Sequence, residues 1–293
     1  MTRVLVTGGS GFIARSFRSR FSSKYEVTCL GRSELDLLNT SQVENCLKNG
    51  HFDVVIHTAN YDAAPAFTTK NRLLVLEQNL KMFFNIARCS QYFGKMLFFG
   101  SGAEFGRENW FPKMPEAFFD VHVPTDQYGL SKYIMTRYAH KSSNIYNLRL
   151  FGVMGEWDDW RYRFVSLACC KAALDRSITY RQNVFFDFIY IEDLLNTIEW
   201  FMVNEPKHKV YNVCTGESHD YQSIAEKIRD ISGKDIEIRA DQPGLNMEYS
   251  GDNSLLMKEI SDYKFTPFDE ALKRMYEWTV KNWDTIDPTG FEY

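Results

Sequence analysis

A strand, a glycine-rich turn and a helix follow one another at the start of the chain, and this order constrains the fold more than any other feature. Arg3–Thr7 is apolar and β-branched, Gly8–Gly11 is the turn, and Phe12–Ser22 has the character of a helix. Glycines let the backbone turn tightly and approach a pyrophosphate, whose charge the N-terminus of the helix stabilises. The segment therefore predicts a dinucleotide-binding unit. Its expected cofactor contacts are Gly8, Gly11, Phe12 and Ile13.

Strand and helix patterns alternate as far as Leu150. The predicted strands are Arg3–Thr7, Glu26–Leu30, Asp53–His57, Lys95–Phe99 and Ile145–Leu150. The predicted helices between them are Phe12–Ser22, Val43–Lys48, Asn71–Tyr92 and Gln127–Lys141. This alternation is typical of parallel strands joined by right-handed helical crossovers. We therefore predict an α/β fold with a doubly wound parallel sheet.

The regular alternation of strand and helix patterns ends after Phe151. An aromatic and charged loop, Trp157–Arg163, is followed by shorter and more mixed elements. The predicted helices here are Phe164–Leu174, Ile191–Val203, Tyr221–Ser232 and Phe268–Lys281, with strands at Val210–Val213 and Ile236–Arg239 and a less regular stretch at Ile178–Phe186. We predict a dinucleotide-binding domain over residues 1–155 and a smaller substrate lobe over 156–293. Strand and helix segments from 180–215 are candidates to return to the first domain.

Composition excludes several classes of function. The chain has 293 residues and a net charge of −4, so no broad basic surface for nucleic acid is expected. No apolar run approaches the ~18 residues of a membrane span, and the N-terminus lacks a signal-peptide pattern. The six cysteines are scattered without a Cys-x-x-Cys pair, and no metal site is predicted. A cytoplasmic protein with reduced thiols is expected.

Tyr128 and Lys132 are spaced so that both side chains lie on one face of a helix. An ammonium near a phenol favours the phenolate and lowers the pKa of the tyrosine. Such a phenol transfers protons near neutral pH, as hydride chemistry on an alcohol or ketone requires. Ser101 follows an apolar strand and is placed to hydrogen-bond a substrate oxygen beside Tyr128.

The ends of the second and third strands indicate how the cofactor binds. The second strand lacks an acidic residue at its tip, where one would hold a ribose 2′-hydroxyl, and carries Arg32 instead. A guanidinium suits a 2′-phosphate, which favours NADP, with NAD as the alternative. Asp36 is expected near the adenine edge, and no acid–base role is assigned to His57. Further expected cofactor contacts are Leu37, Thr58, Ala59, Asn60, Tyr128 and Lys132.

Five segments together resemble the extended short-chain dehydrogenase/reductase family, which contains nucleotide-sugar epimerases, dehydratases and 4-keto reductases. They are Thr7–Ala14, Asp53–Ala59, Ser101–Gly106, Tyr128–Lys132 and Phe188–Asp193. The resemblance implies a Rossmann domain, a sugar nucleotide held by the C-terminal lobe, and catalysis by Ser101, Tyr128 and Lys132. Tyr128 would shuttle the proton, Lys132 would lower its pKa and hold the nicotinamide ribose, and Ser101 would polarise the same oxygen. A homodimer through the helices at Leu73–Tyr92 and around Tyr128 is also implied.

Two departures from the family narrow the expected reaction. Dehydratases of the family carry an Asp-Glu pair after the serine, whereas this chain has Gly102 and Ala103. Fucose-synthase-type epimerases place a cysteine two residues after the serine and a histidine in the loop corresponding to Trp157–Val165. This chain has Ala103, and no histidine lies between His140 and His208. Simple hydride transfer remains, with Gly102 and Ala103 as expected substrate contacts.

Three arginines are candidates for the diphosphate of a nucleotide sugar, because guanidinium forks suit phosphate oxygens. They are Arg161, Arg163 and Arg181. The sequence favours an NADPH-dependent reductase of a 4-keto sugar nucleotide, in a pathway such as polysaccharide biosynthesis. The alternatives are a 4-epimerase with tightly bound NAD and a non-catalytic NADP-binding protein on the same fold.

Overall fold

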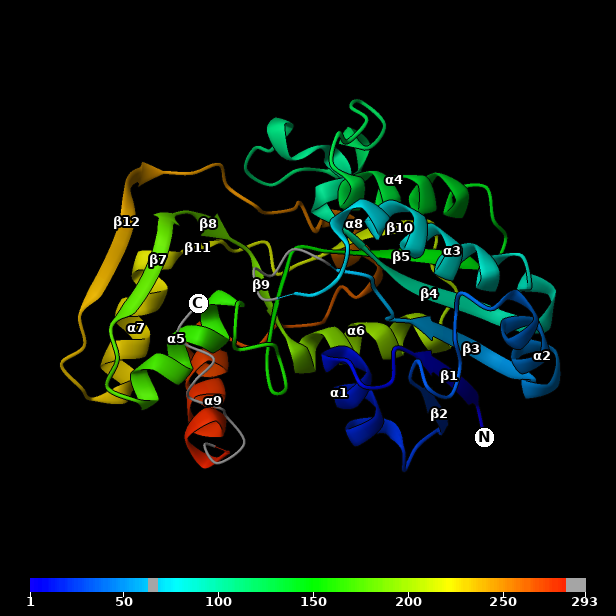
Figure 1. The fold of residues 1–293 in the computed structure, drawn as a ribbon, viewed down its shortest axis with the longest axis horizontal. Helices are drawn as coiled ribbons and strands as arrows, with labels where there is room; N and C mark the ends of the chain where they lie inside the picture. The colour runs from blue at the N-terminus through cyan, green and yellow to red at the C-terminus, as the bar shows by residue number, and fades with distance from the viewer. Residues whose placement is uncertain (63–67, 283–293) are drawn as a thin grey trace.

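Six parallel strands form the central sheet, and helices cover both of its faces (Figure 1). The computed structural model describes residues 1–62 and 68–282. In spatial order the strands are β10 (Val210–Val213), β5 (Ile145–Leu150), β4 (Phe93–Ser101), β3 (Phe52–His57), β1 (Arg3–Thr7) and β2 (Glu26–Leu30). Each strand pairs in parallel with its neighbours. The predicted α/β fold with a doubly wound parallel sheet is therefore confirmed.

The alternation of side chains along β1 explains why both faces need a layer of helices. Val4 and Val6 belong to the core cluster on one face, whereas Leu5 belongs to the cluster on the other, and all three are fully buried. Burying a side chain of this size contributes about 1.5–3 kcal/mol. The first face is covered by α1 (Phe12–Phe21) and α6 (Ile191–Val203). The second is covered by α2 (Thr40–Gly50), α3 (Val75–Ala87) and α4 (Gln127–Ala139).

Side-chain caps determine where two of these helices begin. Asn39 accepts the backbone N–H of Gln42 at 3.1 Å, so α2 begins three residues before the predicted Val43. Asp126 accepts the backbone N–H of Gly129 at 2.9 Å and starts α4. This second cap puts Tyr128 in the first turn of α4.

A second group of elements, all from beyond Phe151, lies at one end of the sheet, at the left of Figure 1. The parallel pair β7 (Ile178–Asn183) and β12 (Ile238–Leu245) forms its outer part. Three helices pack on one another beside this pair: α5 (Phe164–Ala173), α7 (Tyr221–Ser232) and α9 (Phe268–Lys281).

Shorter elements occur along the whole chain. They are β6 (Gly152–Met154), β8 (Phe185–Phe186), β9 (Phe188–Tyr190), β11 (His219–Asp220), α8 (Ser254–Glu259), and the 3₁₀ turns η1 (Arg72–Leu74), η2 (Ser90–Tyr92), η3 (Gly102–Phe105), η4 (Arg107–Asn109) and η5 (Glu116–Phe118).

The chain crosses between these two parts more than once. After β7, β8 and β9 it returns through α6 to β10, which pairs with β5 at the edge of the sheet. The stretch Ile178–Phe186 was expected to be less regular, but it forms β7 and β8. None of the helices within residues 1–62 and 68–282 has both the length and the apolar character needed to cross a membrane.

Candidate functional site

The glycine turn after β1 has a geometry that requires its glycines. Gly8 has φ of +72°, and a Cβ at this position would lie 2.9 Å from both the Ala59 nitrogen and the Thr58 hydroxyl. The Gly11 N–H donates to the Gly8 carbonyl at 2.8 Å, which closes the turn directly before α1. The backbone N–H groups of the first turn of α1 are therefore available for an anion.

A cleft of about 970 Å³ opens at the carboxyl ends of β1 and β3. In open α/β sheets, ligands bind at this edge. All predicted cofactor contacts outside α4 line it, namely Gly8, Gly11, Phe12, Ile13, Arg32, Asp36, Leu37, Thr58, Ala59 and Asn60. Arg32 is exposed, and within the described ranges 1–62 and 68–282 no carboxylate forms an ion pair with it.

Two hydrogen bonds tie the carboxyl ends of β1 and β3 together. The Thr58 hydroxyl donates to the Thr7 carbonyl at 2.7 Å, and the Thr7 hydroxyl lies 2.8 Å from His57 Nδ1. Burial, followed by the charge of Lys132, lowers the pKa of His57 from 6.5 to about 3. His57 is therefore neutral near pH 7, and its ring joins the ends of β3 and β1 through Thr7.

The three predicted catalytic side chains meet at the end of β4. Lys132 is buried and donates from Nζ to the Phe99 carbonyl at 2.9 Å, and Nζ lies 5.6 Å from the centre of the Tyr128 ring. Ser101 ends β4, and its hydroxyl interacts with the Tyr128 phenol, opposing the rise in the pKa of Tyr128 that burial causes. The spacing of Tyr128 and Lys132 along α4 therefore brings both side chains to the strand end that carries the serine.

The pKa of Tyr128 differs from the sequence-based expectation of a lowered value. Burial raises it, and the largest opposing influence is the charge of Arg163, followed by the hydrogen bond with Ser101. Desolvation thus outweighs every influence that lowers this pKa, and the strongest lowering charge is that of Arg163 rather than the predicted Lys132. Burial also lowers the pKa of Lys132 to about 8, whereas the charges of the Glu104 and Asp62 carboxylates act to raise it.

The three arginines predicted for substrate have different surroundings. Arg161 and Arg163 line the cleft from the loop before α5. Arg161 forms a bidentate ion pair with Asp159, with nitrogen–oxygen distances of 2.8 and 2.7 Å. Arg181 is exposed on β7 and is not among the residues that line this cleft.

Gly102 and Ala103 are buried in the 3₁₀ turn η3 and do not line the cleft. A Cβ on Gly102 would lie 2.7 Å from the rings of Phe151 and Tyr249. The packing around residue 102 therefore leaves no space for the acidic side chain that this position carries in dehydratases.

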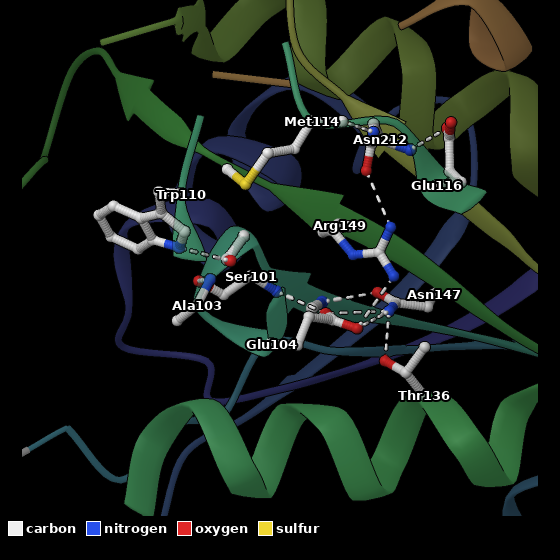
Figure 2. Close-up of polar contacts among 12 residues, drawn as sticks. Ser101, Ala103, Glu104, Trp110, Met114, Glu116, Thr136, Asn147, Arg149 and Asn212 are labelled. Atoms are coloured by element: carbon white, nitrogen blue, oxygen red, sulfur yellow. Dashed lines mark hydrogen bonds and ion pairs between the residues drawn. The ribbon is translucent and has the colours of Figure 1, made fainter. Parts of the chain in front are cut away.

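A buried polar network behind Ser101 was not predicted (Figure 2). Glu104 accepts the backbone N–H of Ser101 at 3.0 Å and pairs with Arg149 at 3.1 Å, with both charged side chains fully buried. Arg149 also donates to Asn212 at 2.9 Å, and Asn147 donates to Thr136 at 2.6 Å. The Ser-x-x-Glu spacing from Ser101 to Glu104 is the signal of a capping box and could have indicated this contact.

Tyr249 is the second residue that sequence reasoning missed. Its hydroxyl lies 3.0 Å from the Ser101 hydroxyl, and its side chain is 5% exposed. It comes from the segment after β12, 148 residues from Ser101. No local motif marks the position, so only the fold reveals this contact.

Comparison with known proteins finds relatives that match over nearly the full length of the chain. The GDP-6-deoxy-D-talose 4-dehydrogenase of Aggregatibacter actinomycetemcomitans is 24% identical over 300 residues, covering 94% of this chain and 97% of the relative. The UDP-glucose 4-epimerase of Thermotoga maritima, solved with UDP-glucose, has a TM-score of 0.82 at 20% identity, covering 96% of this chain and 100% of the other. The GDP-L-fucose synthetase of Naegleria fowleri, bound to NADP, has a TM-score of 0.84 at 18% identity, covering 97% and 94%.

The model of the NAD dependent epimerase/dehydratase family matches residues 4–214. The predicted resemblance to extended short-chain dehydrogenase/reductase enzymes, and with it an NAD(P)-dependent enzyme, is thereby confirmed. Since the match runs from β1 to the end of β10, it includes every strand of the central sheet, and the chain belongs to the NAD dependent epimerase/dehydratase family.

Proposed function

We propose that this protein is an NADPH-dependent reductase of a 4-keto sugar nucleotide. The observation that carries the proposal is the meeting of Ser101, Tyr128 and Lys132 at the end of β4, beside a cleft lined by the glycine turn. The relative that acts as a 4-dehydrogenase on a GDP-linked 6-deoxy sugar supports chemistry at carbon 4.

Each catalytic side chain has one part in the reduction. When bound in the cleft, the dihydronicotinamide supplies a hydride to the carbonyl carbon. Tyr128 donates its proton to the carbonyl oxygen, so that the ketone becomes a secondary alcohol. Ser101 hydrogen-bonds to the same oxygen, and the charges of Lys132 and Arg163 stabilise the phenolate that remains. The raised pKa of Tyr128 keeps its proton in place for donation.

Arg32 is the basis for proposing NADP rather than NAD. Its exposed guanidinium lines the cleft close to Asp36 and Leu37, where the adenosine end of the cofactor would lie. A charge-assisted hydrogen bond to a 2′-phosphate is stronger than one to a hydroxyl. Structural neighbours have been solved with NADP and with NAD, so the choice depends on Arg32.

The second lobe would hold the nucleotide sugar. Arg163 and Arg161 at the cleft are the proposed diphosphate contacts, and Arg181 on β7 would reach a more distant part of the substrate. Gly102 and Ala103 are buried outside the cleft lining, so no direct contact with the sugar is proposed for them.

A substrate panel tests the proposal. Purified protein is mixed with NADPH and the 4-keto-6-deoxy sugars linked to UDP, GDP, CDP and dTDP, and NADPH absorbance is followed. Consumption with at least one sugar is expected, and Tyr128→Phe should lower kcat by about a hundredfold or more. Tyr138→Phe, on the same helix but exposed on its far end, should retain activity. Absence of NADPH consumption across the whole panel would exclude the reductase.

A 4-epimerase with tightly bound NAD is the second candidate, favoured by the structural likeness to UDP-glucose 4-epimerase. Such an enzyme would release NAD on denaturation and interconvert two sugar nucleotides without net use of NADPH. A non-catalytic NADP-binding protein is the remaining possibility. It would be supported if Tyr128→Phe altered none of these activities.

We further propose a homodimer formed by α3 and α4. These helices pack beside one another within the chain, and Leu73, just before α3, and Tyr138, on α4, are 77% and 37% exposed. Sedimentation equilibrium should give twice the chain mass of 34.3 kDa. A monomer at all concentrations would exclude this assembly.

A further inference from the structure

Tyr249 is held rigidly with its hydroxyl against Ser101. Its ring centre lies 4.2 Å from that of Trp110, and 5.1 Å from those of both Phe151 and Phe186. Its backbone N–H donates to the Phe185 carbonyl at 2.9 Å. Aromatic packing on several sides and this backbone bond leave the hydroxyl little freedom to seek another partner.

Counting donors and acceptors assigns a direction to the hydrogen bond between these two hydroxyls. Within residues 1–62 and 68–282, Ser101 Oγ is the one hydrogen-bond partner of the Tyr249 hydroxyl. If Ser101 donated to Tyr249, the buried Tyr249 proton would have no acceptor, which is costly. If Tyr249 donates, its proton is satisfied. Burial raises the pKa of Tyr249 above its usual range, so this proton is retained.

The Ser101 oxygen is then saturated as an acceptor. A serine hydroxyl has one proton and two lone pairs. The Ala103 N–H donates to Ser101 Oγ at 3.2 Å, and the Tyr249 hydroxyl occupies the second lone pair at 3.0 Å. The Ser101 proton is consequently needed by neither of them and is left for the Tyr128 phenol, which also interacts with the Ser101 hydroxyl, or for a substrate oxygen.

We propose that Tyr249 is a positioning residue whose hydroxyl donates to Ser101 and thereby aims the Ser101 proton at the Tyr128 oxygen and at the substrate oxygen bound beside it. A donor fixed before the reaction need not reorient as negative charge develops on that oxygen. This role rests on the proposed reductase or epimerase chemistry, since it acts on the oxygen that changes hydrogen-bonding strength during hydride transfer.

A double-mutant cycle tests whether Tyr249 acts through Ser101. Tyr249→Phe retains the ring and its packing, and we expect kcat to fall about three- to tenfold with KM changed less than twofold. In a Ser101→Ala background, the same replacement should have no further effect on kcat. The control is Tyr211→Phe on β10. It removes another hydroxyl of a buried tyrosine, which is hydrogen-bonded to Glu259 at 2.7 Å, and it should leave kcat unchanged. The proposal would be overturned if Tyr249→Phe lowered kcat equally in the wild-type and Ser101→Ala backgrounds. It would also be overturned if Tyr249→Phe did not change the kcat of an active wild-type enzyme.

A neutron structure of deuterium-exchanged protein provides a test that needs no activity. We expect the Tyr249 deuteron on the line to Ser101 Oγ and the Ser101 deuteron on the side of Tyr128. A Ser101 deuteron directed at Tyr249 would overturn the inference even in an active enzyme. An inactive protein with the expected deuteron positions would instead count against the proposed function alone.

Discussion

The carboxylate of Glu104 and the guanidinium of Arg149 lie 3.1 Å apart, and neither side chain is exposed to solvent. Glu104 also accepts the backbone N–H of Ser101, so the ion pair lies directly behind the serine of the candidate site. A charge in such surroundings is tolerated only while its partner remains. The pair therefore couples the stability of the fold to the geometry of the site.

Replacing Glu104 with glutamine keeps an acceptor for Ser101 but leaves the Arg149 charge without a counter-ion. We expect the free energy of unfolding to fall by about 3–5 kcal/mol, measured by urea denaturation. The matched control is Glu77→Gln, which breaks an exposed ion pair with Lys81 on α3 and should cost about 0.5 kcal/mol or less. Similar losses in the two variants would contradict the importance of the buried pair.

Replacing Arg163 with glutamine should shift the pH profile of the reaction. Arg163 exerts the largest influence that lowers the pKa of Tyr128, so its loss raises that pKa further. Reduction requires the protonated phenol, and the decline of kcat/KM at alkaline pH should therefore move to higher pH. Arg137→Gln, which removes an exposed positive charge from α4, should leave the decline where it is. A shift to lower pH in Arg163→Gln would count against this electrostatic role.

His57 should make the fold sensitive to acid. Its pKa is 6.5 in an unfolded chain and about 3 in the folded protein, so the unfolded state binds the additional proton between these values. Stability is therefore complete above pH 6.5 and is lost as the pH falls towards 3, by at most about 1.4 kcal/mol per pH unit. His57→Asn retains an acceptor for Thr7 and should flatten this dependence.

Urea denaturation between pH 7.5 and 4.5, values chosen to bracket roughly the upper part of that window, measures the effect. His122→Asn, at an exposed position, serves as the control and should retain the wild-type slope. An equal slope in His57→Asn and wild type would show that another group causes the acid sensitivity.

Arg32 should determine the choice of cofactor. Loss of a hydrogen bond to a charged group costs about 1.5–3 kcal/mol, so Arg32→Gln should weaken NADPH binding roughly ten- to a hundredfold and change NADH binding little. Fluorescence titration with both cofactors measures the two Kd values. Arg18→Gln, exposed on α1 and outside the cleft lining, is the control. Equal loss of affinity for both cofactors would argue against a contact with the 2′-phosphate.

Local patterns predicted the buried sheet well, because buried parallel strands are continuous apolar runs with distinct ends. β1, β2, β5 and β10 have the bounds predicted from the sequence. The exposed strand β12 runs over Ile238–Leu245, beyond the predicted Ile236–Arg239, and includes Pro243 and Gly244. Its conformation depends on pairing with β7, a contact that no nearby residue indicates.

The candidate site likewise contains residues that local sequence patterns identify and contacts that only the fold reveals. Ser101, Tyr128 and Lys132 were recognised because short motifs and helical spacing identify them. The influence of Arg163 on Tyr128 and the contact of Tyr249 with Ser101 join segments far apart in the chain. The pKa of Tyr128 was expected to be lowered because the spacing revealed the nearby ammonium, whereas the desolvation that outweighs it depends on the whole fold.

The position of β10 limits the modularity of this protein. The chain leaves the sheet after β5, builds α5 and β7 in the second lobe, and only then supplies β10 as the neighbour of β5. A fragment ending at residue 155 would expose the unpaired backbone edge of β5, which is a template for aggregation. Exchange of the second lobe between relatives must therefore carry β10 along as a replacement for the lost strand, or the grafted chimera will not remain monodisperse.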